Sequence, residues 1–279
     1  MTSQAERGNR FVALHARPGA FVIPNPWDIG TARMLAGLGF EALATTSAGF
    51  AFSLGRRDGE VSREEAIEHA RTIVDATPLP VSADLENGFG DAPEAVAATV
   101  AMATEVGLAG CSIEDATGRP DRPIYERAHA IERVAAAVEA ARASAFPFVL
   151  TARAENFLHG RPDLDDTIAR LQAFEAAGAD VLYAPGLRDL ETIRQVCAAV
   201  TRPVNVLMAL PGMPLSVDQL AAAGVRRISL GSALSRAALG AVLQAAREIR
   251  EHGTFGFIDA AASSAELSGF MQPGRSQAD

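Results

Sequence analysis

Short apolar runs alternate with longer amphipathic segments along almost the whole chain. The apolar runs, rich in Val, Ile, Leu and small residues, predict buried strands at residues 20–23, 42–46, 79–83, 110–113, 148–152, 181–184, 204–207 and 227–230. The segments between them have apolar residues at helical spacing and predict helices at residues 29–38, 63–76, 93–106, 128–143, 164–177, 190–200, 216–223 and 233–250. Strands that alternate with helices in this way are typical of a parallel sheet covered by helices on its outside.

The residues at the boundaries agree with this division. Glycine follows four predicted helices, where a left-handed residue commonly ends a helix, at Gly39, Gly107, Gly178 and Gly224. Serine occupies the expected N-cap position of three helices, at Ser62, Ser216 and Ser232.

Eight strand–helix repeats in about 230 residues favour a (β/α)8 TIM-like barrel over an open, doubly wound sheet. A dinucleotide-binding sheet would carry Gly-x-Gly-x-x-Gly after its first strand, where this chain has Pro24-Asn25-Pro26-Trp27-Asp28. No linker or change of composition divides the chain. We therefore expect one domain over residues 1–271, a barrel with C-terminal helices, followed by a polar tail at residues 272–279.

Composition and charge exclude several classes of protein. The chain has 279 residues, 48% of them hydrophobic, so it can bury a large core. Its net charge of −9 and the absence of any basic run argue against nucleic-acid binding. All 25 basic residues are arginine, which excludes Schiff-base lysine chemistry and a phosphate-binding-loop lysine. No signal-peptide pattern or membrane-length apolar run is present, so we expect a cytoplasmic protein with no membrane partner.

Charged residues follow the predicted strands directly, where the active sites of barrel enzymes lie. The third strand is followed by Asp84 and Glu86, the fourth by Glu114 and the fifth by Arg153. Gly88 and Gly90 should let the chain curl after the third strand, so that both of its acids point inward. Charges that converge on one mouth are costly to desolvate unless they are paired or bind a metal. The three carboxylates therefore indicate a site for a hard divalent cation. Arg153 has two parallel N–H groups that could bind a substrate carboxylate.

Six short motifs occur in order at successive strand ends: Pro24-Asn25-Pro26-Trp27-Asp28, Thr46-Ser47-Ala48-Gly49, Leu54-Gly55-Arg56-Arg57-Asp58, Asp84-Leu85-Glu86-Asn87-Gly88-Phe89-Gly90, Ile113-Glu114-Asp115 and Thr151-Ala152-Arg153. Together they resemble the isocitrate lyase/phosphoenolpyruvate mutase superfamily over nearly the whole chain. The resemblance implies a barrel whose last helix swaps onto a neighbouring subunit in homodimers or homotetramers. It also implies Mg²⁺ or Mn²⁺ as the metal and a small 2-oxo carboxylate as the ligand.

The resemblance implies a metal site at three of these residues. Asp84 would contact the cation directly, and Glu86 and Glu114 would hold it through water molecules. A 2-oxo acid would chelate the cation through one carboxylate oxygen and its keto oxygen. The cation would then stabilise the enolate that forms when the neighbouring bond breaks or is made.

The resemblance also implies substrate contacts. Ser47 and the backbone N–H groups of Ala48 and Gly49 would hold the substrate carboxylate, and Arg153 would lie against the ketone. We therefore assign catalytic roles to Asp58, Arg153 and Glu114. We assign substrate binding to Ser47, Ala48, Gly49, Asp84, Arg153 and, within the seventh strand, Asn205.

One segment departs from the superfamily pattern. Lyases of the superfamily carry Lys-Lys-Cys-Gly-His after the fourth strand, whereas residues 115–125 here contain neither cysteine nor histidine. The phosphonate-processing branch has a lysine and an asparagine in this loop and a histidine after the sixth strand, where this chain has Ala184-Pro185-Gly186. The segment is rich in Gly and Pro, as a lid is. Within it, Arg119, Arg122 and Tyr125 are candidates to replace the lyase cysteine.

We predict an Mg²⁺-dependent enzyme that binds a 2-oxo acid of the pyruvate, oxaloacetate or 2-oxoglutarate type. The enzyme would make or break the carbon–carbon bond next to the keto group. Two alternatives stay open: phosphorus–carbon chemistry of the phosphoenolpyruvate mutase or phosphonopyruvate hydrolase type, and a 2-oxo acid binding protein without catalysis.

The other reactive side chains have structural interpretations. Cys111 lies within a predicted strand and should be a buried, inert thiol. Glu155 should pair with Arg153. The five histidines lack the spacing of metal ligands and should be structural or solvated, although His159 follows the fifth strand most closely.

Overall fold

A computed structural model describes residues 2–271, and the predicted polar tail at residues 272–279 lies outside the described residues. All eight predicted strands are confirmed: β1 (Phe21–Ile23), β2 (Leu43–Ala44), β3 (Val81–Asp84), β4 (Gly110–Glu114), β5 (Val149–Arg153), β6 (Val181–Tyr183), β7 (Val204–Leu207) and β8 (Arg227–Ser229). They form one parallel sheet in the order β1-β8-β7-β6-β5-β4-β3-β2.

The barrel is nearly closed between its first and second strands. Among residues 2–271, β1 and β2 form no ladder, but the backbone N–H of Ala44 donates to the carbonyl of Pro24 at 3.0 Å. The buried side chain of Asn25 also spans this gap, because its Nδ2 donates to the carbonyl of Thr45 and its Oδ1 accepts from the N–H of Leu230. Side-chain bonds therefore do at this seam what a strand ladder does elsewhere.

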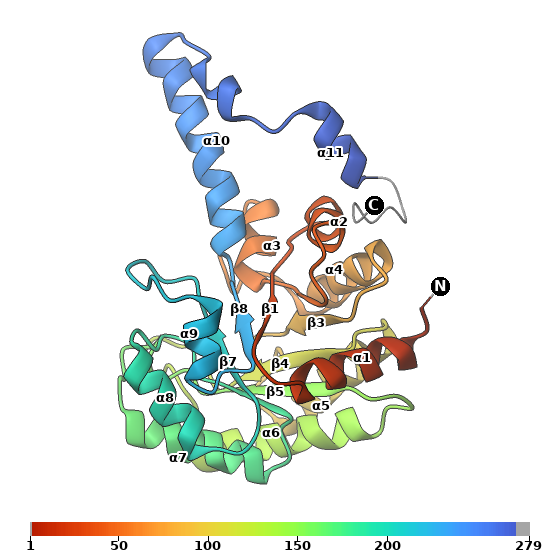
Figure 1. Cartoon of the computed structure of the whole chain (residues 1–279). Coiled ribbons are helices and arrows are strands. Elements are labelled where there is room, and N and C mark those ends of the chain that lie inside the picture. The colour runs from red at the N-terminus through yellow and green to blue at the C-terminus, as the bar shows by residue number, and fades with distance from the viewer. Residues whose placement is uncertain (1, 272–279) are drawn as a thin grey trace.

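Helices surround the sheet (Figure 1). They are α1 (Gln4–Ala16), α2 (Ile29–Gly37), α3 (Ser47–Ser53), α4 (Arg63–Ala76), α5 (Pro93–Glu105), α6 (Arg127–Arg142), α7 (Leu164–Ala176), α8 (Leu190–Ala199), α9 (Val217–Ala222), α10 (Ala233–His252), the 3₁₀ helix η1 (Gly256–Ala260) and α11 (Ser264–Phe270). The eight predicted helices are confirmed, with ends that differ by at most two residues. The sequence analysis did not predict α1, α3, η1 or α11.

The unpredicted α1 carries a start signal of its own. Ser3 and Glu6 form a reciprocal capping box, the Ser-x-x-Glu pattern that marks a helix start. Phe11 of this helix is fully buried. Gly8 lies so close to the carbonyl of Pro147 that a Cβ there would be 2.2 Å from the oxygen. The helix thus packs tightly near the amino-terminal end of β5.

The predicted helix ends are mostly confirmed. Ser62 and Ser216 form capping boxes, and the four predicted glycines all have positive φ, between 87° and 102°. Ser232 occupies the predicted N-cap position of α10, but its backbone is not extended (φ −80°, ψ 8°) and its side chain makes no capping hydrogen bond. Gly231, which lies between β8 and Ser232, has a positive φ of 51°.

Two hydrophobic clusters fill the space between sheet and helices. One joins β2–β5 to α2, α4, α5 and α6, and the other joins β5–β8 to α6–α9. Cys111 lies in the first cluster, fully buried, and burial raises the pKa of its thiol well above the usual value. The predicted structural role of this cysteine is thereby confirmed.

The C-terminal arm leaves the barrel (Figure 1). Helix α10 projects away from the sheet, and the chain returns through η1 to place α11 against α2 of the same chain. There the ring of Phe270 lies so close to Gly37 that a Cβ would be 2.7 Å from it. No helix among residues 2–271 is both long and apolar enough to cross a bilayer.

Candidate active site at the carboxyl ends of the strands

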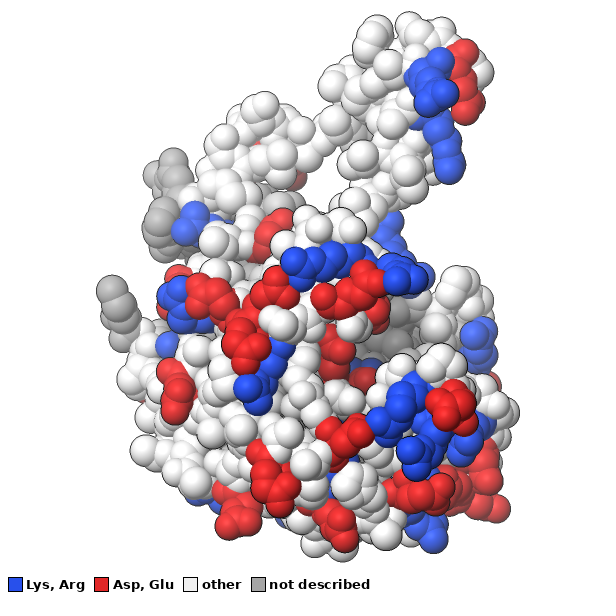
Figure 2. All heavy atoms as spheres, turned by 180° about the vertical axis from the view of Figure 1, so that it is seen from behind, with Lys and Arg blue, Asp and Glu red and all other residues white. Residues whose placement is uncertain are grey.

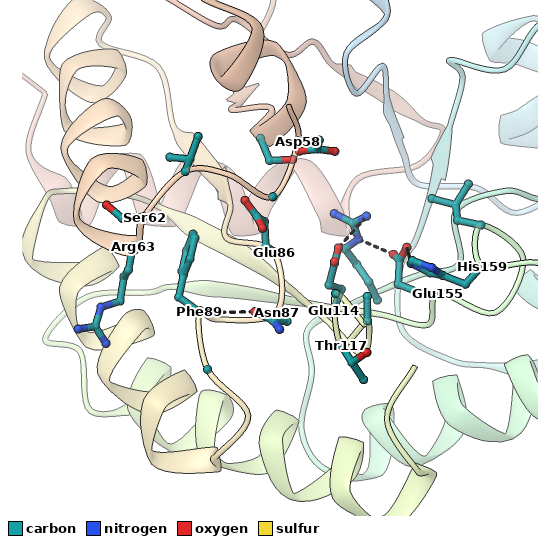
Figure 3. Close-up of a pocket in the computed structure, with 18 of the residues that line it drawn as sticks. Asp58, Ser62, Arg63, Glu86, Asn87, Phe89, Glu114, Thr117, Glu155 and His159 are labelled. Carbon is teal, nitrogen blue, oxygen red and sulfur yellow. Dashed lines mark hydrogen bonds and ion pairs between the residues drawn. The ribbon is translucent and has the colours of Figure 1, made fainter. Parts of the chain in front are cut away.

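A cavity of about 930 Å³ opens at the carboxyl ends of the strands (Figure 3). Five of the predicted site residues line it: Ser47, Asp58, Glu86, Glu114 and Arg153. A smaller chamber of about 50 Å³ is lined by two others, Asp84 and Asn205. Arg153 borders both spaces, so it lies at the boundary between the wide cavity and the barrel interior.

Arg153, the last residue of β5, forms the centre of the site. Its Nη1 lies 2.9 Å from Asp84 Oδ1 and its Nη2 lies 3.0 Å from Glu114 Oε2. Its Nε donates to Glu155 Oε1 at 2.8 Å, which confirms the predicted pair. Burial opposes the charge of the guanidinium, but the carboxylates of Glu114, Glu155 and Asp84 outweigh burial and raise the pKa of Arg153 further. The guanidinium of Arg153 thus pairs with three carboxylates.

Asp84 is fixed on both of its oxygens at the end of β3. Besides Arg153, Oδ1 accepts a long hydrogen bond from Ser112 Oγ at 3.4 Å. Oδ2 accepts from Ser47 Oγ at 3.1 Å and from the backbone N–H of Ser47 at 3.4 Å. Its own backbone N–H donates to Thr45 Oγ1. The carboxylate therefore has a defined orientation before any ligand binds.

Ser47, Ala48 and Gly49 form the first turn of α3. Thr46 caps this helix, because its Oγ1 accepts from the N–H of Gly49 at 3.2 Å. A Cβ on Gly49 would lie 2.5 Å from Cγ2 of Thr46, so only glycine fits this turn. The N–H of Gly49 already has a partner, and the N–H and hydroxyl of Ser47 point to Asp84.

The loop after β3 is held in an uncommon backbone conformation. Glu86 (φ 48°), Gly88 (φ 79°) and Phe89 (φ 58°) all lie in the left-handed region, which is uncommon for the two that are not glycine. Gly90 does not have positive φ, so its predicted role in curling the chain was wrong; there a Cβ would meet Cβ of Ala95 at 2.7 Å. Such strain is maintained only where surrounding contacts impose it, and it turns Glu86 toward the cavity (Figure 3).

Arg133 supplies those contacts. It extends from α6, almost fully buried, and donates to the carbonyl of Gly90 at 2.6 Å and to the carbonyls of Asn87 and Asp91. Its guanidinium also lies over the ring of Tyr125, 4.2 Å from the ring centroid. Arg133 was not predicted as a site residue, because nothing in its helical context distinguishes it from a surface arginine.

The carboxylates at the mouth carry more negative charge than Arg153 offsets. Burial, then the charges of Asp84 and Asp58, raise the pKa of Glu86 to about 7. Burial, then Asp84, also raise the pKa of Asp58. Burial raises the pKa of Glu114 well above its usual value despite Arg153. A site of this kind attracts a further cation.

The donor set fits a hydrated cation. Among residues 2–271, no three His, Cys, Asp or Glu side chains lie close enough together to bind one metal ion directly. Mg²⁺ suits such a place, because it commonly keeps several water molecules and takes one or two carboxylates from the protein. The carboxylates that line the cavity and their raised pKa values agree with that mode of binding.

Comparison with known proteins fits this arrangement. The phosphoenolpyruvate phosphomutase family model matches residues 11–250. A candidate lyase/mutase from Burkholderia cenocepacia J2315, of known crystal structure, is 61% identical, with 97% of each chain covered and a TM-score of 0.94. The chain belongs to the isocitrate lyase/phosphoenolpyruvate mutase superfamily.

Two more distant superfamily relatives are carbon–carbon bond enzymes by name. A Corynebacterium glutamicum protein assigned as 2-methylisocitrate lyase 1 is 31% identical over 258 residues, which are 89% of this chain and 83% of that protein. An oxaloacetate acetylhydrolase, solved with its product oxalate, is 29% identical, with 97% of this chain and 94% of that chain covered and a TM-score of 0.84. The superfamily thus includes carbon–carbon bond-cleaving enzymes as well as phosphoenolpyruvate mutase.

Residues 115–125, which differ from the lyase motif of the superfamily, are held in place by hydrogen bonds and ion pairs. Ala116 and Ile124 form an antiparallel bridge, and Asp115 forms a buried ion pair with Arg170 at 3.0 Å. Arg119 pairs with Asp91 at 2.6 Å, and the hydroxyl of Tyr125 donates to Asp91 at 2.5 Å. The segment is therefore a braced turn in this structure.

None of the three candidates from this segment lines the cavity. Arg119, Arg122 and Tyr125 border a separate, shallow hollow with Asp91 and His129. Only Ala116, Thr117 and Gly118 of the segment reach the cavity, and the hydroxyl of Thr117 is bonded to the carbonyl of Arg122. Among the described residues, this segment offers the cavity no ionisable group.

Asn205 and Arg227 lie in the barrel interior. The Asn205 amide donates through Nδ2 to Ser229 Oγ and accepts at Oδ1 from Arg227 Nε, both at 2.9 Å. Arg227 is 4% exposed and donates through Nη2 to Thr151 Oγ1. No carboxylate of the described chain forms an ion pair with it, and burial lowers its pKa to about 10. The sequence analysis took it as part of a strand and missed its role in holding Asn205.

Proposed function

We propose that this protein is an Mg²⁺-dependent enzyme that binds a small 2-oxo carboxylate and makes or breaks the carbon–carbon bond next to the keto group. One observation carries the proposal: Arg153 and the surplus of carboxylates around it lie together at the base of a cavity. The acids suit a cation, and the cation with Arg153 suits an anionic, oxygen-rich ligand.

In this proposal the metal is Mg²⁺, or Mn²⁺ in its place. Asp84 would bind it directly, and Glu86 and Glu114 would bind its water molecules. A bound cation would draw electrons from the keto group of the ligand and offset negative charge on the keto oxygen. The fixed orientation of Asp84 between Ser47 and Arg153 supports its role as the direct ligand.

The substrate would lie between α3 and Arg153. Ser47 and the backbone N–H groups of Ala48 and Gly49 would hold its carboxylate at the start of α3. For this, Ser47 and Gly49 would exchange their present partners, Asp84 and Thr46, for the ligand. Arg153 would place a permanent positive charge beside the ketone, because a guanidinium does not lose its proton in the working pH range. Asn205, oriented by Arg227, would contact the ligand from the chamber side.

Asp58 and Glu114 are the proposed proton-handling acids of the site. Both line the cavity, and both have pKa values raised above the ordinary range by burial. A carboxylate with a raised pKa is a stronger base than an ordinary carboxylate, which suits it to accept and return a proton. This supports a role next to the reacting bond in place of a purely structural one.

Phosphorus–carbon chemistry is the second candidate, because the matching family model is that of phosphoenolpyruvate phosphomutase. The cavity argues for the first candidate. The two loop arginines that could neutralise a dianionic phosphonate lie outside it. Carbon–carbon bond cleavage is also the reaction type that the names of the two distant relatives carry.

A ligand screen with added metal tests the proposal. We expect Mg²⁺ with pyruvate, oxaloacetate, oxalate or 2-oxoglutarate to raise Tm, since a ligand at about 100 times its Kd stabilises a protein by about 2.7 kcal/mol. Asp84→Ala should abolish the metal-linked part of this shift, and Glu132→Ala, an exposed acid on α6, should leave it unchanged.

The screen also separates the alternatives. Turnover of an oxo or hydroxy acid would support the first candidate, and turnover of phosphonopyruvate followed by ³¹P NMR would support the second. Binding without turnover of any panel member would favour a binding protein. An unchanged metal-linked shift in the Asp84 variant would contradict the proposed metal site.

We also propose that the projecting helix α10 swaps onto a neighbouring subunit in a homodimer or homotetramer and packs against that second copy of the chain. The helix exposes Leu239, Val242 and Leu243, and Figure 2 shows that the arm is largely uncharged except near its tip. A contiguous apolar surface of this kind is usual at protein interfaces. Light scattering should give a mass of at least two chains, and Val242→Glu with Leu243→Glu should reduce it to one; a wild-type monomer would contradict this.

A further inference from the structure

Bond cleavage of the proposed kind leaves an electron pair on one carbon, and that carbon must receive a proton. The braced segment 115–125 offers no ionisable side chain to the cavity. Asp58 is the proposed acceptor of the proton that leaves oxygen, and Glu114 is proposed to hold the metal. The proton for carbon must therefore come from another group at the mouth. The inference below rests on the proposed function and names one group in it.

His159 lines the cavity on the side of β5 (Figure 3). It follows that strand by six positions, and its backbone N–H donates to the carbonyl of Glu155. Its Nε2 lies 3.8 Å from Glu155 Oε2, within ion-pair distance when the imidazole is protonated. The side chain is 34% exposed, so it can exchange protons with water while it faces the cavity.

Glu155 faces the imidazole from a fixed position. Its side chain is 2% exposed, and its other oxygen, Oε1, accepts from Arg153 Nε at 2.8 Å. Its backbone N–H donates to Asp115 Oδ1, which the ion pair with Arg170 anchors in turn. A carboxylate that is held on one oxygen and faces an imidazole with the other is a common way to orient a histidine for proton transfer.

The loop that carries His159 is itself firmly packed. The N–H of Arg161 donates to the carbonyl of Asn156 at 2.9 Å. Gly186, with φ 96°, lies against the loop from behind, and a Cβ there would be 2.8 Å from Cβ of Phe157. The turn after β6 thus lies so close to the His159 loop that no side chain larger than that of glycine fits between them.

The other four histidines have different surroundings. His15 lies at the base of the barrel between Phe11 and Phe21, and burial lowers its pKa to about 3. His69 stacks on Phe50 and bonds to the carbonyl of Trp27. His129 bonds to the carbonyl of Asp91 on the outer face, and His252 ends α10. Among the described residues, His159 alone of the histidines lines the cavity.

We propose that His159 is the general acid/base of this enzyme, in place of the loop cysteine that lyases of the superfamily carry. In the cleavage direction the substrate is a hydroxy acid whose hydroxyl gives its proton to Asp58 and becomes the keto group of the 2-oxo acid as the neighbouring carbon–carbon bond breaks. The electron pair of that bond passes to the departing carbon, the imidazolium of His159 gives that carbon a proton, and Asp58 returns its own proton to water. The imidazole is then neutral and regains a proton from water at its exposed side. In the direction of bond formation, neutral His159 removes the same proton, so charge and atoms balance both ways.

The test is His159→Ala with rescue by added imidazole, measured with the oxo or hydroxy acid that the wild-type protein turns over. We expect kcat to fall by about 10²–10⁴-fold, the usual range for loss of a general acid. Free imidazole should restore at least part of the loss, because the cavity of about 930 Å³ admits it. His252→Ala, a histidine far along the arm, should have wild-type kcat with or without imidazole.

Binding measured in the same variants separates this inference from the proposed function. The Tm shift with Mg²⁺ and oxalate should stay in His159→Ala, since the residue is not a proposed ligand of either. A full kcat in His159→Ala, or a loss that imidazole does not restore in a variant that still binds Mg²⁺ and oxalate, would overturn the inference alone. If His159→Ala does not fold, His159→Gln replaces it, with the same loss of kcat expected; a full kcat in a His159→Gln variant that binds Mg²⁺ and oxalate would overturn the inference. Absence of turnover in the wild-type protein would overturn the proposed function and this inference with it.

Discussion

Two buried arginines, one at the mouth of the barrel and one in its interior, have opposite electrostatic surroundings. Arg153 lies within 3.0 Å of carboxylates of Asp84, Glu114 and Glu155, which raise its pKa. Arg227 is bonded to the neutral side chains of Asn205 and Thr151, and burial lowers its pKa to about 10. Arginine is thus surrounded by carboxylates at the mouth of the barrel and by neutral polar side chains in its interior.

The difference separates binding from support. Around Arg153 the negative charge of the carboxylates exceeds the positive charge of the guanidinium, so the mouth attracts a further cation. Around Arg227 each named bond orients a neutral side chain, and Asn205 in particular has both amide atoms engaged. The interior therefore fixes geometry, and the mouth supplies the electrostatic attraction for metal and ligand.

The largest expected effect comes from removing each arginine in turn. Arg153→Met leaves three carboxylates without their shared cation and should lower the free energy of unfolding by about 3–5 kcal/mol in the absence of metal. Arg227→Met removes a buried charge but leaves none unpaired, so the loss should stay below about 2 kcal/mol. Urea denaturation in a metal chelator measures both.

Added Mg²⁺ sharpens this comparison. It should recover part of the stability that Arg153→Met loses, because it can replace positive charge at the mouth, and it should not change the effect of Arg227→Met. Equal losses in the two variants, or a larger loss for Arg227→Met, would show that the two environments do not differ in the way described.

A smaller effect should appear as a dependence of stability on pH. Because the folded-state pKa of Glu86 is raised from 4.5 to about 7, the folded protein binds a proton there that the unfolded chain releases at lower pH. The metal-free protein should therefore lose stability as pH rises from about 4.5 to about 7, by roughly 1–3 kcal/mol or about 3–10 °C in Tm. Arg227, whose pKa is about 10, should contribute nothing in this range.

Calorimetry without metal, at about pH 5 and about pH 8, checks this expectation. Glu86→Gln should flatten the profile, and excess Mg²⁺ should raise Tm mainly at the higher pH, where the carboxylates are ionised. A Tm that rises across this interval in the metal-free protein would contradict the described electrostatics of the mouth.

Much of the fold was predictable from sequence because its signals are local. The eight strands are continuous apolar runs, and Ser62 and Ser216 mark helix starts with side chains three residues from their partners. The acids after β3 and β4 and the arginine after β5 were also predictable as neighbours, since parallel strands bring their carboxyl ends to one edge. Helix α1 could have been predicted too, from the capping box at Ser3 and Glu6.

Partner choice was not predictable in the same way. Arg119 and Tyr125 follow a strand end as Arg153 does, yet both bind Asp91 on the outer side of the barrel. Arg133 is one of several arginines on helices, but it alone of those described bonds to the carbonyls of the loop after β3. These contacts join residues that are 28 to 46 positions apart in the sequence, and the periodic pattern of apolar residues does not predict them.

The sequence by itself determined the barrel, the acidic mouth and the superfamily, because apolar period, strand order and motif order are all written along the chain. Only the tertiary structure decided which charges meet. It placed Arg153 among three carboxylates, turned Glu86 inward through a left-handed backbone, gave Arg227 neutral partners and left His159 facing the cavity. The physical reason is that charge pairing and pKa depend on distances of a few ångströms between strands, which local sequence does not encode.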